Sequence, residues 1–233
     1  SLPDGRAIVF VNHRESAERV YGLLKKAGFP VGLYHGGLEQ RERQLAIDLF
    51  NNGTTPILVS TDLGSRGLDI DDVNYVIHYH LPLTPETWTH RNGRTARMHA
   101  EGEAFIILGP TEQMPEYATE ATDFLIAEGE NIPDAVTWER DLYPTGKEPA
   151  EGGIRSHVAT LYFNAGKKEK ISRGDIAGFL IQKGGLTKDE VGKIVVNDHS
   201  AIAAVPRDKA REVVEAVAPH RLKNTKVKIT LMR

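Results

Sequence analysis

Three arginines lie close together in the stretch His90-Arg91-Asn92-Gly93-Arg94-Thr95-Ala96-Arg97. A guanidinium group is always charged and offers its N–H donors in a planar fork, which suits the oxygens of a phosphate group. The stretch therefore predicts a site that grips a transferring phosphoryl group. The simpler alternative is a helix face whose arginines form salt bridges within the domain.

Two other segments could take part in the same chemistry. The loop from Thr61 to Ile70 combines two hydroxyls, two carboxylates, an arginine and two glycines, and it directly follows the apolar run 56–60. His35-Gly36-Gly37 follows the apolar run 31–34, and its glycines let a backbone approach a phosphate closely. For His35 itself, a packing role and a functional role stay equally open, whereas we expect His78 and His80 to be packing residues.

The elements that must position these segments alternate along the chain. Apolar, β-branched runs predict strands at 7–11, 31–34, 56–60, 75–79 and 103–108, and helical spacing predicts helices at 14–27 and 39–52, with a helix start at 85–88. This alternation predicts a parallel sheet with helices on both faces. Ligands of such sheets bind beyond the carboxyl ends of the strands, where we expect the three segments.

Composition and charge narrow the class of protein. The chain of 233 residues has no cysteine, which excludes disulfides and thiolate metal sites, and it has no long apolar run that predicts a membrane span. Residues 156–233 carry 15 Lys and Arg against 8 Asp and Glu, a net charge of +7, although the whole chain has a net charge of -3. A basic small domain favours nucleic acid as a partner, and a merely solvated surface is the alternative.

The segments together resemble a known family. The runs 8–12, 35–53, 60–70 and 90–97 resemble motifs IV, IVa, V and VI of the C-terminal RecA-like domain of DEAD-box RNA helicases, in the same order and spacing. The resemblance covers about residues 6–110. It implies an ATP-dependent enzyme that acts on RNA, with a second RecA-like domain of the same protein as its partner.

The resemblance also implies roles for individual residues. Arg94 and Arg97 would reach the γ-phosphate as catalytic arginine fingers and, with Gly67 and Asp69, would bind the nucleotide. Arg66 and Arg91 would act at the interface with the facing domain. Single-stranded RNA would be held through its phosphates by His13, Gly36, Arg43 and Thr61. His13 and Asn92 depart from the residues usual in the family, as do Ala96 and His99.

Some parts of an ATPase are missing from the sequence. It contains neither the pattern Gly-x-x-x-x-Gly-Lys-Ser/Thr, which cradles phosphates, nor Asp-Glu-Ala-Asp. In this family the N-terminal RecA-like domain supplies both, and it holds the Mg²⁺ that accompanies ATP. We therefore expect the chain to be a fragment that does not hydrolyse ATP alone and that contains no metal site of its own.

The remaining sequence predicts a connector and a second domain. We place the RecA-like domain at 1–129, with a closing helix at 111–129, an acidic connector with several prolines at 130–155, and the second domain at 156–233. Strands at 158–163, 192–196, 201–205 and 226–232 with helices at 173–183 and 208–217 give a β-α-β-β-α-β order. This order predicts a small α+β domain like an RNA-recognition motif, although the aromatic residues for base stacking are absent.

The second domain also shows a family resemblance. Residues 159–170, 174–178 and 192–194 resemble the RNA-binding domain that ends DbpA-type bacterial DEAD-box helicases. The resemblance implies that this tail targets structured RNA, often ribosomal. The candidate phosphate contacts are Lys167, Lys168, Lys170, Arg173 and Lys193, each of which could instead be a solvated surface cation.

We therefore interpret the chain as the C-terminal part of a cytoplasmic, bacterial DEAD-box RNA helicase that uses ATP to separate structured RNA. The main alternative is an RNA-binding protein without enzymatic activity that has kept a helicase-like fold. A DNA-directed relative is disfavoured by the RNA-type tail.

Overall fold

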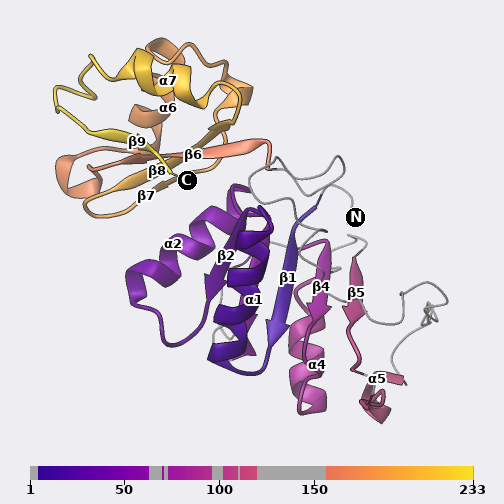
Figure 1. The fold of residues 1–233 in the computed structure, drawn as a ribbon. Helices are drawn as coiled ribbons and strands as arrows, with labels where there is room; N and C mark the ends of the chain where they lie inside the picture. Colours follow the sequence, from indigo (N-terminus) through magenta and orange to yellow (C-terminus); the bar gives the residue numbers. More distant parts are fainter. Residues whose placement is uncertain are drawn as a thin grey trace.

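The computed structural model describes residues 5–62, 70, 73–95, 102–109, 111–119 and 156–232. These residues form two units, which we call the RecA-like domain and the tail domain (Figure 1). Residues 130–155, the predicted connector, lie outside the described residues, so the predicted domain limits stay predictions.

The RecA-like domain is built on a parallel sheet of five strands. Its strands are β1 (Ala7–Val11), β2 (Val31–Tyr34), β3 (Ile57–Thr61), β4 (Tyr75–His78) and β5 (Glu103–Ile106). They lie in the order β2-β3-β1-β4-β5, and every neighbouring pair is parallel. The predicted strands are confirmed, with ends that differ by one or two residues.

Helices cover both faces of this sheet, as predicted. The helices are α1 (Arg14–Lys26), α2 (Gln40–Asn51), α4 (Pro85–Asn92) and the short α5 (Glu116–Thr119). Val9 of β1 belongs to the same apolar cluster as Ala17 of α1, whereas the next residue, Phe10, packs with Phe50 of α2. Successive side chains of a strand point to opposite faces, so α1 and α2 lie on opposite sides of the sheet. Of the predicted closing helix, α5 is described, and residues 120–129 lie outside the described residues.

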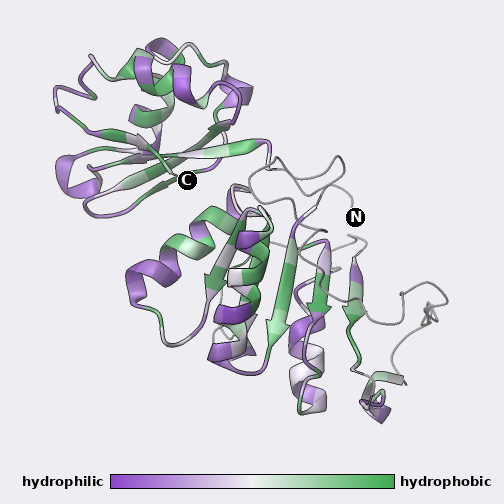
Figure 2. Cartoon of the chain, viewed as in Figure 1, coloured by the Kyte–Doolittle hydropathy of each residue, from purple (hydrophilic) through white to green (hydrophobic). Residues whose placement is uncertain are grey.

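The tail domain has the predicted β-α-β-β-α-β order. Its elements are β6 (Val158–Phe163), α6 (Arg173–Gln182), β7 (Ile194–Val196), β8 (Ala201–Pro206), α7 (Ala210–Val217) and β9 (Ile229–Leu231), with short 3-10 turns η2 (Lys167–Glu169) and η3 (Lys188–Glu190). The strands form an antiparallel sheet in the order β7-β8-β6-β9. Figure 2 shows the green, apolar residues of the sheet and of the two helices that cover it.

The two helices of the tail domain pack on one face of its sheet only. Leu161 of β6 and Ala203 of β8 belong to the apolar core that also contains Ile176 of α6 and Val213 of α7. The alternate residues of the same strands, among them Thr160, therefore point to the other face, which we call the outer face. Figure 1 shows this outer face turned toward α2 of the RecA-like domain.

Candidate nucleotide and RNA site

Arg91 is the best-anchored residue of the arginine stretch. It lies in the last turn of α4 with 1% of its surface exposed, and it forms a two-pronged ion pair with Asp62. Its Nε donates to Oδ1 of Asp62 at 2.6 Å, and one terminal nitrogen donates to Oδ2 at 2.7 Å. Asp62 directly follows β3, so this pair ties the arginine stretch to the loop after the third strand.

The other donors of Arg91 are also satisfied inside the RecA-like domain. They reach Oδ1 of Asn12 at 2.7 Å and the main-chain oxygen of His80 at 2.8 Å, and the guanidinium lies 5.2 Å from the centre of the Phe10 ring. The guanidinium thus joins the carboxyl ends of β1, β3 and β4. Arg91 is therefore salt-bridged within its own domain. Its expected role at the interface with a facing domain stays a prediction.

The main chain of Arg94 lies near the amino end of β4 rather than at the carboxyl edge of the sheet. Its main-chain oxygen accepts a hydrogen bond from the nitrogen of Val73, which precedes β4, because α4 runs antiparallel to that strand. The expectation that the whole arginine stretch lies at the carboxyl ends of the strands is therefore wrong for Arg94, and it holds for the side chain of Arg91. The side chain of Arg94 is half-buried.

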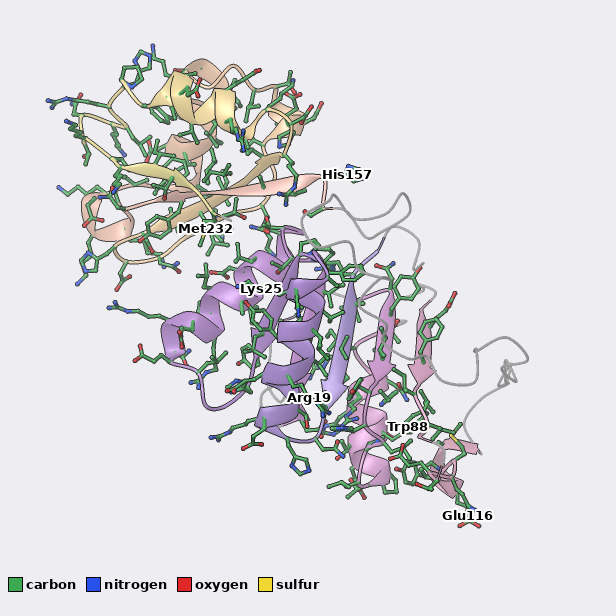
Figure 3. The ribbon with its side chains drawn as sticks, viewed as in Figure 1. Arg19, Lys25, Trp88, Glu116, His157 and Met232 are labelled. Atoms are coloured by element: carbon green, nitrogen blue, oxygen red, sulfur yellow. The ribbon has the colours of Figure 1, made fainter. Side chains whose placement is uncertain are left out.

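His78 and His80 are packing residues, as expected. His78 is fully buried, stacks on Trp88 with ring centres 4.7 Å apart, and bonds Asn92 at 2.9 Å. Burial and, to a smaller extent, the nearby Arg91 lower the pKa of His78 to about 4, although the hydrogen bond that its Nε2 makes to Oδ1 of Asn92 opposes this shift. Burial also lowers the pKa of His80. Figure 3 labels Trp88 on α4, on the side where Glu116 of α5 lies.

The turn after β2 carries the expected glycines. Nδ1 of His35 accepts a hydrogen bond from the main-chain nitrogen of Gly37 at 3.1 Å, and its Nε2 lies 3.5 Å from the carboxylate of Glu18. His35 is 3% exposed, which favours the packing role. A side-chain carbon placed on Gly36 would lie 3.4 Å from Arg14, so the turn and the start of α1 are neighbours.

The four predicted RNA contacts of the RecA-like domain do not share one environment. His13 and Gly36 are exposed at the carboxyl ends of β1 and β2, whereas Thr61 is buried. Arg43 is half-buried in the first turns of α2, where it donates to the oxygens of Leu38 at 2.8 Å and Gln40 at 2.6 Å. Arg66, Gly67, Asp69 and Arg97 lie outside the described residues.

The predicted contacts of the tail domain form two groups. Lys167, Lys168 and Lys170 are exposed on and next to η2, whose backbone is bonded to the turn at 197–198. Gly166 is required there, because an added side-chain carbon would lie 2.1 Å from the main-chain oxygen of Asn197. Arg173 and Lys193 form the second group, and both are exposed. They lie beside α2 of the RecA-like domain, where they line a cavity of about 420 Å³ together with Arg43.

A polar contact between the two domains was not predicted from the sequence. The hydroxyl of Thr160 accepts a hydrogen bond from the side-chain nitrogen of Asn52 at 2.9 Å and lies 2.6 Å from the hydroxyl of Thr54. Ser156 donates to the main-chain oxygen of Gly53 at 2.7 Å. All four side chains that take part are buried. These residues are polar and more than 100 positions apart, so no sequence pattern connects them.

Among the residues that the structure describes, no group of His, Asp and Glu is arranged to hold a metal ion. Among the same residues, no helix is both long and apolar enough to cross a lipid bilayer.

Comparisons with known proteins divide the chain in the same way. A model of the helicase conserved C-terminal domain matches residues 1–99, and a model of the DbpA RNA-binding domain matches residues 160–231. ATP-dependent RNA helicase DbpA of Bacillus subtilis is 29% identical over 97% of this chain and 48% of its own length. DbpA of Escherichia coli is 30% identical over 97% of this chain and 47% of its own length. The chain thus spans about half the length of these relatives.

The similar solved structures match a smaller part of this chain. The C-terminal domain of the DEAD-box protein Dbp5 is 33% identical, with a TM-score of 0.44, over 51% of this chain and 67% of that structure. A DEAD-box protein from Methanococcus jannaschii is 39% identical, with a TM-score of 0.43, over 45% of this chain and 29% of that structure.

Proposed function

Because the chain belongs to the DEAD-box ATP-dependent RNA helicases that carry a DbpA RNA-binding domain, we propose that it forms one half of an RNA-stimulated ATPase that separates RNA strands. The other half would be an N-terminal RecA-like domain of the same protein, which would hold the phosphates of ATP and Mg²⁺. The tail domain would direct the enzyme to structured RNA, with ribosomal RNA as the class of target, in the cytoplasm.

One observation carries this proposal. The ion pair of Arg91 with Asp62 joins the arginine stretch to the loop after β3, two segments 29 residues apart that both contain predicted nucleotide contacts. The pair also neutralises the carboxylate of Asp62. A phosphate bound nearby would therefore not meet an unpaired carboxylate at Asp62.

The proposed mechanism assigns the predicted residues to three tasks: ATP hydrolysis, nucleotide binding and RNA binding. ATP supplies the phosphoanhydride whose cleavage resets the cycle. Arg94 and Arg97 would stabilise negative charge on the transferring phosphoryl group, and Gly67 and Asp69 would hold the nucleotide. His13, Gly36, Arg43 and Thr61 would hold one RNA strand through its backbone.

The test is an arginine substitution in the full-length protein. We expect Arg97→Ala, and separately Arg94→Ala, to lower RNA-stimulated ATP hydrolysis by a factor on the order of 10³ or more while RNA binding is retained. Arg211→Ala, an exposed arginine on α7, is the control and should leave hydrolysis unchanged. Undiminished hydrolysis by Arg97→Ala would refute the catalytic assignment. RNA binding without any ATPase activity in the unmodified protein would favour the non-enzymatic alternative.

A further inference from the structure

Part of the outer face of the tail sheet is covered. Thr160 on β6 and Ala204 on β8 are neighbours on this face, and Ile202 lies in the next row; their exposed fractions are 0%, 2% and 2%. All three are absent from the core beneath α6 and α7. A base cannot stack on a surface that solvent does not reach, so this part of the sheet is closed to RNA in this arrangement.

The contact that closes it is specific. Asn52, Thr54 and Thr160 form a buried network in which Asn52 also accepts a hydrogen bond from the main-chain nitrogen of Thr54 at 3.0 Å. Every polar group of such a network must keep its partner, since an unsatisfied buried donor costs about 1 to 3 kcal/mol. The tail domain is therefore held in one register on the end of α2.

A groove runs along α2 beside this contact. It extends from Gln40 to Asn51 on the RecA-like side, and its volume is about 420 Å³. A helix of this length spans about 18 Å. One end lies at the turn after β2, where Gly36 is exposed, and the far wall is formed by the tail domain. The groove thus connects the carboxyl edge of the first sheet to the tail domain.

The groove has an excess of positive charge. Arg43 comes from α2, Arg173 begins α6 and Lys193 precedes β7. Within the described residues neither Arg43 nor Arg173 forms an ion pair with a carboxylate. Of the described residues that line the groove, Asp48 alone carries a carboxylate. It is buried, accepts a hydrogen bond from Gln44 at 3.0 Å and interacts with Lys193. The groove therefore keeps a net positive charge with Asp48 ionised.

We propose that this groove binds the phosphate backbone of an RNA strand, with Arg43 of the RecA-like domain and Arg173 and Lys193 of the tail domain as its cationic contacts. The site exists only while the two domains are docked. An RNA strand that lies on the carboxyl edge of the first sheet continues through it onto the tail domain. This inference deepens the proposed function and rests on it for the choice of RNA as the ligand.

The first test changes the charge of the groove. A fluorescently labelled short oligouridylate, which has no structure of its own, is bound to the 233-residue chain at several salt concentrations, and its anisotropy is measured. We expect the double variant Arg173→Gln, Lys193→Gln to bind about tenfold more weakly and to lower the salt slope by about 1.4, or 0.7 for each lost contact. The control Lys188→Gln, Arg211→Gln removes two exposed cations elsewhere on the tail domain and should change binding little.

The second test separates the domains while adding positive charge. Thr160→Lys places a charge in the buried contact, and because residue 160 lies outside the tail core, the tail domain should still fold. We expect weaker binding of the oligouridylate despite the added cation. Thr230→Lys, on the exposed part of the same sheet face, makes the same charge change without touching the contact. It should bind as well as the unmodified chain or better.

Each outcome decides the proposal. Unchanged affinity in the groove variant, equal effects of the two lysine variants, or no binding by the unmodified chain at low salt would overturn it. The proposed function has a separate readout, the ATPase activity of Arg97→Ala in the full-length protein. Loss of that activity together with unaffected groove variants would refute the groove alone, and the opposite pair of results would refute the catalytic assignment alone.

Discussion

Single residues at the site combine charge with burial. His78 lies between Trp88 and Arg91, and a second positive charge beside Arg91 would be unfavourable in this buried position. Burial and this charge together explain why His78 is neutral in the folded domain. The free energy of unfolding should therefore depend on pH.

The pKa of His78 is about 4 in the folded state and about 6.5 in an unfolded chain. The unfolded state therefore binds the proton first, so stability is full above pH 6.5 and is lost as the pH falls toward 4. Between about pH 7 and about pH 5 we expect a loss of about 2 kcal/mol that the variant His78→Gln does not share. Urea unfolding of the 233-residue chain at both pH values, followed by tryptophan fluorescence, measures it. An equal loss in the variant would show that His78 does not titrate in this way.

The partner of Arg91 could not be predicted from the sequence. The spacing of Arg91, Arg94 and Arg97 predicted a phosphate site, but spacing does not reveal that Arg91 has a carboxylate partner 29 residues away. A buried ion pair between distant segments leaves no periodic trace. The roles of Arg94 and Arg97, by contrast, were implied by the family resemblance and still await the ATPase measurement.

The elements themselves were largely predictable. Apolar β-branched runs gave all nine strands of the two described sheets, because burial on both faces or on alternate residues leaves a clear pattern. The ends shifted by up to three residues, as at β7 and β9, which begin two and three residues later than predicted. The loops between elements, which contain most of the predicted site residues, follow no such period.

The η2 turn is an element whose backbone can be tested. Gly166→Ala would place a side-chain carbon 2.1 Å from the oxygen of Asn197 and 2.8 Å from that of Asp198, so the backbone must move. We expect a loss of at least about 2 kcal/mol and weaker binding of structured RNA, because Lys167, Lys168 and Lys170 sit on this turn. Gly178→Ala on α6 meets nothing within 4 Å and should be neutral or slightly stabilising. Urea unfolding monitored by circular dichroism compares the two, and equal stabilities would contradict the expectation.

The two domains meet at a polar contact between Asn52, Thr54 and Thr160. Thr160 lies more than 100 positions from its two partners in the chain, so the sequence predicted two domains but not that they dock. Removing one hydroxyl from this contact tests how far it holds the domains together.

Thr160→Val keeps the shape of the side chain and removes the hydroxyl that bonds Asn52 and Thr54. We expect the docked state to lose about 1 to 3 kcal/mol, with a larger radius of gyration in solution scattering and faster amide exchange at Thr54. Thr230→Val, exposed on the same face, should change neither quantity. Identical scattering and exchange for the two variants would mean that the hydroxyl does not hold the domains together.

The position of this contact has a mechanical consequence. The tail domain is fixed near the start of β6, while Lys167 and its neighbours lie beyond the other end of that strand, about 20 Å away. When a rigid domain rotates about a contact at one of its ends, the residues at the opposite end move the farthest. If the RecA-like domain turned by a small angle, RNA gripped at Lys167 would be displaced farther than RNA gripped beside α2, and the tail domain would act as a lever arm that converts rotation into tension on the strand.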